Sequence, residues 1–198
     1  HDVALAWMRS FLDLWKEGAG AVLWYGHGAP DLVVRTVWMT DDGNRRPEWD
    51  KGEVDQPVFL RSAAAWDINP RSAAFFFAVA CSNAYPYEED NLTAALFRTG
   101  AIAASGASEW AAVYGAETGF KDHGSATGIG YRFMENLIAG GMDAGTAMHM
   151  ANGDPLTDWG DPYWWANRFD YNLYGDPTVL YAGGQWATPI PEPEIYWA

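Results

Sequence analysis

The stretch Ala-Ala-Phe-Phe-Phe-Ala-Val-Ala-Cys-Ser-Asn, residues 73–83, decides the fold of this chain. Residues 73–80 form an apolar run without alternation, which is typical of a β-strand covered on both faces. The run ends at Cys81, Ser82 and Asn83, three small residues that open a loop. We therefore expect a central buried strand that presents a thiol at its carboxyl end.

Two shorter runs of the same kind lie on either side of this stretch in the sequence. Ala21–Tyr25 ends at Gly26, His27 and Gly28, and Ala101–Ser105 follows later. Apolar residues at helical spacing predict helices before, between and after these runs, at residues 3–15, 92–99, 126–139 and 144–151. Strands that alternate with helices predict parallel βαβ units, and hence an α/β fold with an open, mostly parallel sheet flanked by helices.

The remaining segments have weaker patterns. We expect one domain over residues 1–182, followed by a Pro-rich tail or linker over 183–198. Within the domain we expect a surface excursion at 40–57, a helix at 58–66, a Trp-rich loop at 153–170 and extended segments at 171–174 and 178–181.

Composition excludes several classes of partner. The 198 residues are 49% apolar, enough for one sizeable core, and 12 Lys and Arg stand against 26 Asp and Glu, a formal charge of -14. The electrostatic field of this negative charge repels phosphate backbones and anionic lipid, so we expect no nucleic-acid partner. The longest apolar run, 73–81, is too short to span a membrane. A single cysteine permits no internal disulfide.

His27 and Cys81 each follow a predicted strand, where the loops of a parallel sheet converge. A thiolate can attack a carbonyl, and a histidine can assist its formation and then protonate the leaving amine. The N–H groups of Gly28 and Cys81 could bind the developing oxyanion. A lone cysteine in this position is usually a buried hydrophobe, but the pair favours acyl-transfer catalysis.

Three motifs carry a resemblance to a known family. Residues 25–28 (Tyr-Gly-His-Gly), 80–83 (Ala-Cys-Ser-Asn) and 175–177 (Gly-Asp-Pro) resemble, in order and spacing, the landmarks of the gingipain family of clan CD. The likeness runs from about residue 22 to 180. The Gly-Asp-Pro motif is expected to be structural, with the proline fixing a turn and Asp176 bonding to local backbone.

The resemblance implies a caspase-like fold and a secreted or cell-surface cysteine endopeptidase. His27 would be the general acid or base and Cys81 the nucleophile of a thioester acyl-enzyme, with Gly28 and Cys81 in the oxyanion hole. Trp110 would lie near the wall of the primary specificity pocket. No cofactor is required for this chemistry.

The resemblance also implies partners and a metal. Beyond a peptide or protein substrate, the family has further strands upstream of the first strand here, so an upstream fragment of the same precursor is expected to associate with this chain. A structural Ca²⁺ is a family-level expectation, and Asp154, Asp158 and Asp161 lie close enough in sequence to share it.

Further residues have competing interpretations. Ser82, Asn83 and His123 are candidate substrate contacts, while His149 is expected to be a packing or surface residue. Trp159, Trp164 and Trp165 could stack on sugar rings. A catalytically silent surface module that binds glycan or protein, and a transpeptidase that uses the same dyad, therefore remain as alternatives.

Overall fold

The computed structural model describes residues 2–68, 73–113, 123–157 and 160–181. The predicted tail at 183–198 lies outside these residues, as do Asp158 and Trp159. The helices are α1 (Asp2–Lys16), the 3₁₀ helix η1 (Ser62–Asp67), α2 (Leu92–Thr99), α3 (Ala126–Met134), the π-helix η3 (Glu135–Ala139), α4 (Ala144–Asn152) and α5 (Pro162–Asp170). The strands are β1 (Ala21–Tyr25), β2 (His27–Ala29), β3 (Leu32–Val34), β4 (Val37–Trp38), β5 (Val54–Asp55), β6 (Val58–Arg61), β7 (Ala74–Val79), β8 (Ala101–Ala107) and β9 (Tyr171–Gly175).

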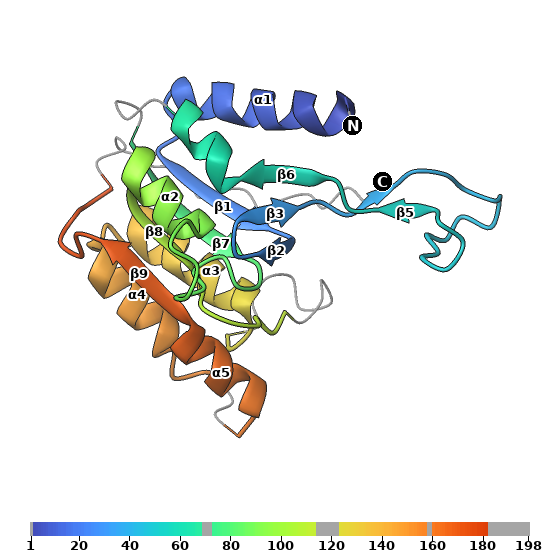
Figure 1. Cartoon of the computed structure of the whole chain (residues 1–198). Coiled ribbons are helices and arrows are strands. Elements are labelled where there is room, and N and C mark those ends of the chain that lie inside the picture. The colour runs from blue at the N-terminus through green and yellow to red at the C-terminus, as the bar shows by residue number, and fades with distance from the viewer. Residues whose placement is uncertain (1, 69–72, 114–122, 158–159, 182–198) are drawn as a thin grey trace.

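A four-stranded sheet in the order β1-β7-β8-β9 forms the centre of the molecule (Figure 1). The pairs β1–β7 and β7–β8 are parallel, and β9 closes the sheet as an antiparallel edge strand. The prediction of an open, mostly parallel α/β sheet is confirmed. Among the described residues, no helix is long and apolar enough to cross a bilayer.

Strand β7 is the centre of the core because every one of its residues is buried. Phe75, Phe77 and Val79 face a cluster formed with α3 and α4, while Phe76 and Ala78 face the cluster formed with α1 and α2. Neighbouring residues of a strand point to opposite faces, so an unbroken apolar run supplies both layers. The predicted double-sided burial of this strand is confirmed.

Strand β1 was expected to be buried on both faces, and this was wrong. It is an edge strand of the sheet, with only β7 beside it among the described strands. Val22 and Trp24 pack on the core, but Leu23 is 41% exposed and Tyr25 is 50% exposed on the opposite face. The apolar run predicts the strand correctly, but only the strand order decides how much of it is covered.

The expected surface excursion at 40–57 is largely exposed and is bounded by the β4–β5 pair. Local sequence was misinterpreted at three other places. Residues 58–66 begin as strand β6 before they become η1. Residues 162–170 of the expected loop form α5, which Asp161 caps. In the expected extended segment 178–181, the described residues contain one isolated bridge, from Asp143 to Leu180.

The Gly-Asp-Pro motif has the predicted structural role. Asp176 Oδ1 accepts hydrogen bonds from the Thr178 N–H at 2.9 Å and from its hydroxyl at 2.7 Å. Gly175 has φ of 129° and packs closely on β8, so a side chain there would be strained. These contacts end β9 and turn the chain toward α4, where the Gly145 N–H donates to the Pro177 carbonyl.

Candidate active site

The two predicted catalytic segments leave the sheet side by side. In the parallel β1–β7 pair, Tyr25 lies opposite Val79, and the Gly26 N–H extends the pairing by donating to the Val79 carbonyl at 3.2 Å. His27 and Cys81 are each two residues beyond this last pair. Paired strands are about 4.8 Å apart, so the sheet brings the two segments together at one rim, as predicted.

Gly28 lies directly against the segment that carries Cys81. A Cβ atom at Gly28 would be 2.7 Å from the Cys81 carbonyl oxygen and 2.7 Å from Asn83 Oδ1. Both distances are shorter than real Cβ contacts, so residue 28 must be glycine for the two segments to pack in this way. The absence of a side chain at Gly28 therefore allows the segment that carries His27 to pack directly on the segment that carries Cys81.

Asn83 is fully buried and joins the same two segments through its side chain. Its amide nitrogen donates to the carbonyls of Ala29 at 2.7 Å and Leu32 at 2.9 Å, in the β2–β3 turn just after His27. The backbone carbonyl of Asn83 accepts from the Thr93 N–H of α2 at 3.0 Å. This burial makes Asn83 a residue that positions the rim, with its side chain directed into the protein.

We expect Asn83→Ala to weaken both stability and cleavage. The variant loses two hydrogen bonds, each contributing on the order of 1 kcal/mol, so the free energy of unfolding falls by about 2 kcal/mol in urea titration. The matched control is Asn172→Ala, whose exposed side chain also bonds two carbonyls, Phe169 and Asp170, but only within its own turn. Equal losses for both variants would contradict a bridging role.

Ser82 joins the cysteine loop to the loop that follows β8. Its N–H and its hydroxyl both donate to the Glu109 carbonyl, at 2.7 and 3.2 Å. Its φ of 58° lies in the left-handed region, which costs a non-glycine residue roughly 1 kcal/mol or more. The fold thus holds the residue next to Cys81 in a strained conformation, and strain of this kind is concentrated at functional sites.

The Cys81 thiol is half-buried at the edge of the core, and its sulfur lies 3.9 Å from the Ala111 carbonyl oxygen. Tyr171, the first residue of β9, is buried close to it and stacks on Phe77. Burial raises the pKa of Tyr171 above its usual range, and the charge of a Cys81 thiolate adds to the rise. The phenol therefore stays protonated beside the thiol, a neighbour that the sequence did not reveal.

Trp110 lies on the loop that follows β8 and is exposed. Its ring makes an edge contact with Tyr163 of α5, with 5.6 Å between ring centroids. The neighbouring Ala111 carbonyl faces the Cys81 sulfur. The exposed indole of Trp110 is therefore one residue away from the carbonyl that contacts the thiol. This position is suited to ligand binding.

Asn167 holds this loop in place and was missed by the sequence interpretation. Its buried side chain accepts from the Ala112 N–H at 2.8 Å and donates to the carbonyls of Ala112 and Gly124, both at 2.9 Å. It comes from α5, which was expected to be a loop. Asp161 as a helix cap followed by Pro162 in the first turn was the signal that could have predicted this helix.

His123 is paired with a carboxylate. Its Nδ1 lies 2.6 Å from Asp154 Oδ2, and Arg132 Nε lies 3.7 Å from the same oxygen. Burial acts to raise the pKa of Asp154. Hydrogen bonds from His123 and the Leu156 N–H, together with the positive charges of His123 and Arg132, outweigh this effect, so the pKa of Asp154 is lowered overall. The structure thus gives His123 a carboxylate partner, and its expected contact with substrate stays a prediction.

Two of the three predicted calcium ligands, Asp154 and Asp161, lie among the described residues and Asp158 lies outside them, so the calcium site stays a prediction. Asp154 is occupied by His123 and Arg132, and Asp161 caps α5 by accepting from the Tyr163 N–H at 2.8 Å. A different acidic group lies in the β4–β5 excursion, where Asp41, Asp42 and Glu53 have ligand atoms within 4.8 Å of one another. Lys51 already pairs with Asp42 there.

Comparisons with known proteins give one family match and two structures of similar fold. The model of peptidase family C25 matches residues 4–182. The crystal structure of the Arg-specific cysteine proteinase gingipain R (RgpB) is similar in fold, with a TM-score of 0.62, 14% identity, and coverage of 87% of this chain and 35% of that chain.

The complex of the RgpB pro- and mature domains from Porphyromonas gingivalis gives a TM-score of 0.54 at 13% identity, covering 87% of this chain and 36% of that chain. The present chain thus spans about a third of the length of these structures. No curated protein matches it.

Proposed function

Because this chain belongs to peptidase family C25, we propose that it is a cysteine endopeptidase with Cys81 as nucleophile and His27 as proton-transfer group. The observation that carries the proposal is the packing of Gly28 against the Cys81 carbonyl, which brings the two strand-end segments to one rim. An exposed imidazole and a half-buried thiol at this rim supply the base and the nucleophile that acyl transfer needs.

In the proposed reaction, His27 accepts the thiol proton and Cys81 Sγ forms a bond to the carbonyl carbon of the substrate. The backbone N–H groups of Gly28 and Cys81 are the candidate donors to the developing oxyanion. When the C–N bond breaks, His27 gives the proton to the leaving amine. Water then hydrolyses the thioester and regenerates the thiol, so the cycle needs no cofactor.

Alkylation of the thiol tests this proposal. The chain has a single cysteine, so iodoacetamide labelling followed by peptide mass mapping reports on Cys81 alone. We expect labelling and the loss of casein cleavage to proceed at the same rate. Full labelling with cleavage unchanged would exclude Cys81 as the nucleophile.

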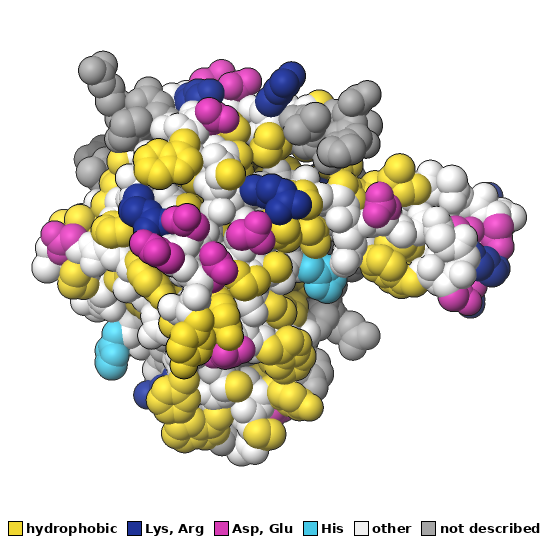
Figure 2. All heavy atoms as spheres, in the orientation of Figure 1, with side chains coloured by type: hydrophobic (Ala, Val, Ile, Leu, Met, Phe, Trp, Pro, Cys, Tyr) yellow, Lys and Arg dark blue, Asp and Glu magenta, His cyan; other side chains and the backbone are white. Residues whose placement is uncertain are grey.

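Two alternatives lead to different results in the same assay. A transpeptidase would release joined products when a second amine is added, and their mass distinguishes joining from hydrolysis. A silent binding module would label without ever cleaving. The exposed rings of Trp110, Tyr163 and Trp165 favour a ligand-binding surface in either case. Figure 2 shows hydrophobic side chains gathered on the lower part of this face, where Figure 1 places α5.

We also propose that an upstream fragment of the same precursor completes the sheet at β1 and that the assembly acts outside the cell. Among the described strands only β7 pairs with β1, and Leu23 and Tyr25 are exposed on one face, which supports the first part. The acidic composition supports the second. Co-purification of the fragment with wild-type chain, and its loss with Leu23→Lys, would test the association.

A further inference from the structure

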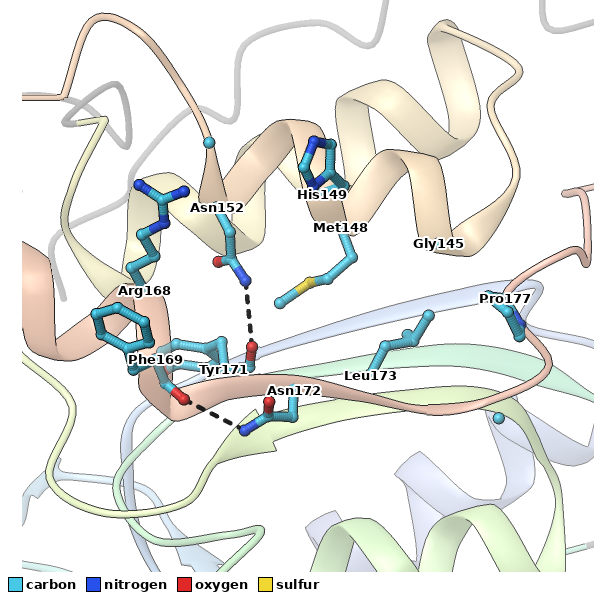
Figure 3. Close-up of a pocket in the computed structure, with 12 residues that line it drawn as sticks. Gly145, Met148, His149, Asn152, Arg168, Phe169, Tyr171, Asn172, Leu173 and Pro177 are labelled. Atoms are coloured by element: carbon cyan, nitrogen blue, oxygen red, sulfur yellow. Dashed lines mark hydrogen bonds between the residues drawn. The ribbon is translucent and has the colours of Figure 1, made fainter.

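Tyr171 brings a buried hydroxyl to the face of the sheet that carries the proposed nucleophile. Phe77 and Val79 share this face of β7, and Cys81, two residues beyond Val79, packs on the same core cluster. Tyr171 belongs to the cluster, is 1% exposed and stacks on the Phe77 ring. The Asn152 side chain of α4 fixes its backbone by donating to the Tyr171 carbonyl at 3.2 Å (Figure 3). The phenol is therefore held in place on the same side as the thiol.

The phenol oxygen lies close to Ala80 and Cys81. Burial is the main reason that the pKa of Tyr171 is above its usual range, a negative charge on Cys81 adds to the rise, and the Ala80 N–H opposes it. A backbone N–H acts on a phenol only at short range, so the oxygen lies beside this segment. Among the described residues, its O–H has no hydrogen-bond acceptor. A buried donor without an acceptor is unfavourable, and a catalytic role is one explanation for its presence.

The present contact of the Cys81 sulfur is suited to a thiol but not to a thiolate. Sγ lies 3.9 Å from the Ala111 carbonyl oxygen, to which the S–H donates. Once the thiol proton has moved to His27, this carbonyl oxygen faces a negative sulfur, and the contact becomes repulsive because both atoms are acceptors. A thiolate at this position therefore requires a donor, and the phenol O–H is a buried donor without an acceptor among the described residues.

We propose that Tyr171 is a further catalytic residue: when Cys81 ionises, Sγ turns from the Ala111 carbonyl toward the Tyr171 O–H, which donates a hydrogen bond to the thiolate. The role rests on the proposed function, in which Cys81 is the nucleophile. The phenol keeps its proton throughout, because burial disfavours the phenolate. When Sγ bonds to the carbonyl carbon of the substrate, the negative charge leaves the sulfur and the hydrogen bond weakens.

Other charged groups near this pair also influence ionisation. Asp170 precedes Tyr171 and its charge acts on the phenol, and burial together with the charge of Glu109 raises the pKa of Asp170. Both carboxylates disfavour a thiolate when they are ionised, whereas a protonated His27 favours one. The residues of α3 that pack on the cluster are apolar. Two basic residues share with Tyr171 the lining of the groove between α4 and β9, namely His149 and Arg168.

The test compares the pH dependence of Cys81 alkylation by iodoacetamide in the wild-type chain and in Tyr171→Phe, since only the thiolate reacts. The variant loses a hydrogen bond to the charged form and keeps every other charged group. We expect the midpoint of its pH–rate profile to rise by about one pH unit, so that labelling below both midpoints is about tenfold slower. An unchanged midpoint would overturn the proposal.

The matched control is Tyr174→Phe, which removes a phenol hydroxyl from the same strand. The Tyr174 hydroxyl donates to the Ala84 carbonyl at 3.5 Å, and Tyr174 lies opposite Ala104, which belongs to the other core cluster. We expect its midpoint to equal that of the wild-type chain. An equal rise in both variants would contradict a specific bond from Tyr171 to the sulfur.

Thermal melting separates this role from a structural one. Tyr171→Phe keeps the ring that stacks on Phe77 and removes only the hydroxyl. Because this hydroxyl has no acceptor among the described residues, we expect the melting temperature to equal or exceed that of the wild-type chain. A clear loss of stability, or a variant that does not fold, would make the hydroxyl a structural group and overturn the proposal.

The same two profiles in a His27→Ala background remove the coupled titration of the imidazole. We expect the rise of about one pH unit to persist there, because the O–H acts on the sulfur directly. Its disappearance would contradict the proposed bond. No substrate is needed in any of these measurements, so a chain that never cleaves a peptide can still show the rise, and an active peptidase can lack it.

Discussion

Cys81→Ala is expected to abolish the proposed peptide-bond cleavage, with kcat/KM lower by a factor of at least about 10⁴. The reason is that the acyl group has no other thiol to bond to, because the chain contains a single cysteine. The side chain is half-buried and at the edge of a core cluster, so its truncation changes the free energy of unfolding little. A quenched fluorescent protein substrate measures the activity, and thermal melting confirms that the variant is folded.

A pair of histidine variants extends this test to the proton-transfer group. His27→Ala is expected to lower kcat/KM by about 10²–10⁴, the usual contribution of a general acid or base. His149→Ala is the matched control because His149 is also an exposed histidine but lies on α4. Residual activity near wild type in Cys81→Ala, or equal losses in the two histidine variants, would argue against the dyad.

Phe77→Ala lowers the free energy of unfolding by about 3–5 kcal/mol, the cost of truncating a fully buried aromatic residue. Phe77 is 0% exposed, stacks on Tyr171 with 5.0 Å between ring centroids and lies 5.5 Å from the Phe133 ring. A Cβ on Gly130 would be 3.0 Å from its ring, so α3 packs tightly on it. Little room is therefore left for the core to relax around the cavity.

The control for this variant is Phe97→Ala, in the last turn of α2 and 41% exposed. Its expected cost is below about 1 kcal/mol, as for most partly exposed sites. Urea titration of both variants gives the two values under two-state conditions. Similar losses at the two positions would show that β7 is not the centre of the core.

The loops that carry the proposed active site are held by buried side chains that also stabilise the fold. Asn83 joins the cysteine segment to the β2–β3 turn, and Asn167 joins the loop after β8 to α5. Both side chains are fully buried amides whose nitrogen donates to two backbone carbonyls. The loops at the rim are therefore held by side chains that do not themselves face solvent.

The amino-acid sequence by itself determined the elements around β7 and the positions of His27 and Cys81. Unbroken apolar runs predicted β1, β7 and β8, and helical spacing predicted α1, α2, α3 and α4. These signals are local, because burial on both faces of a strand requires apolar residues at every position. The placement of both reactive residues at one rim followed from the common direction of parallel strands.

Only the tertiary structure decided which strand lies at an edge, which carboxylates are already paired and which buried amides join the loops. The exposure of Leu23, the pairing of Asp154 with His123 and the bonds of Asn83 and Asn167 each join residues far apart in the chain or depend on strand order. Such contacts leave no periodic pattern in the sequence. They arise when segments are packed together, because buried polar groups must then find hydrogen-bond partners wherever the fold brings them.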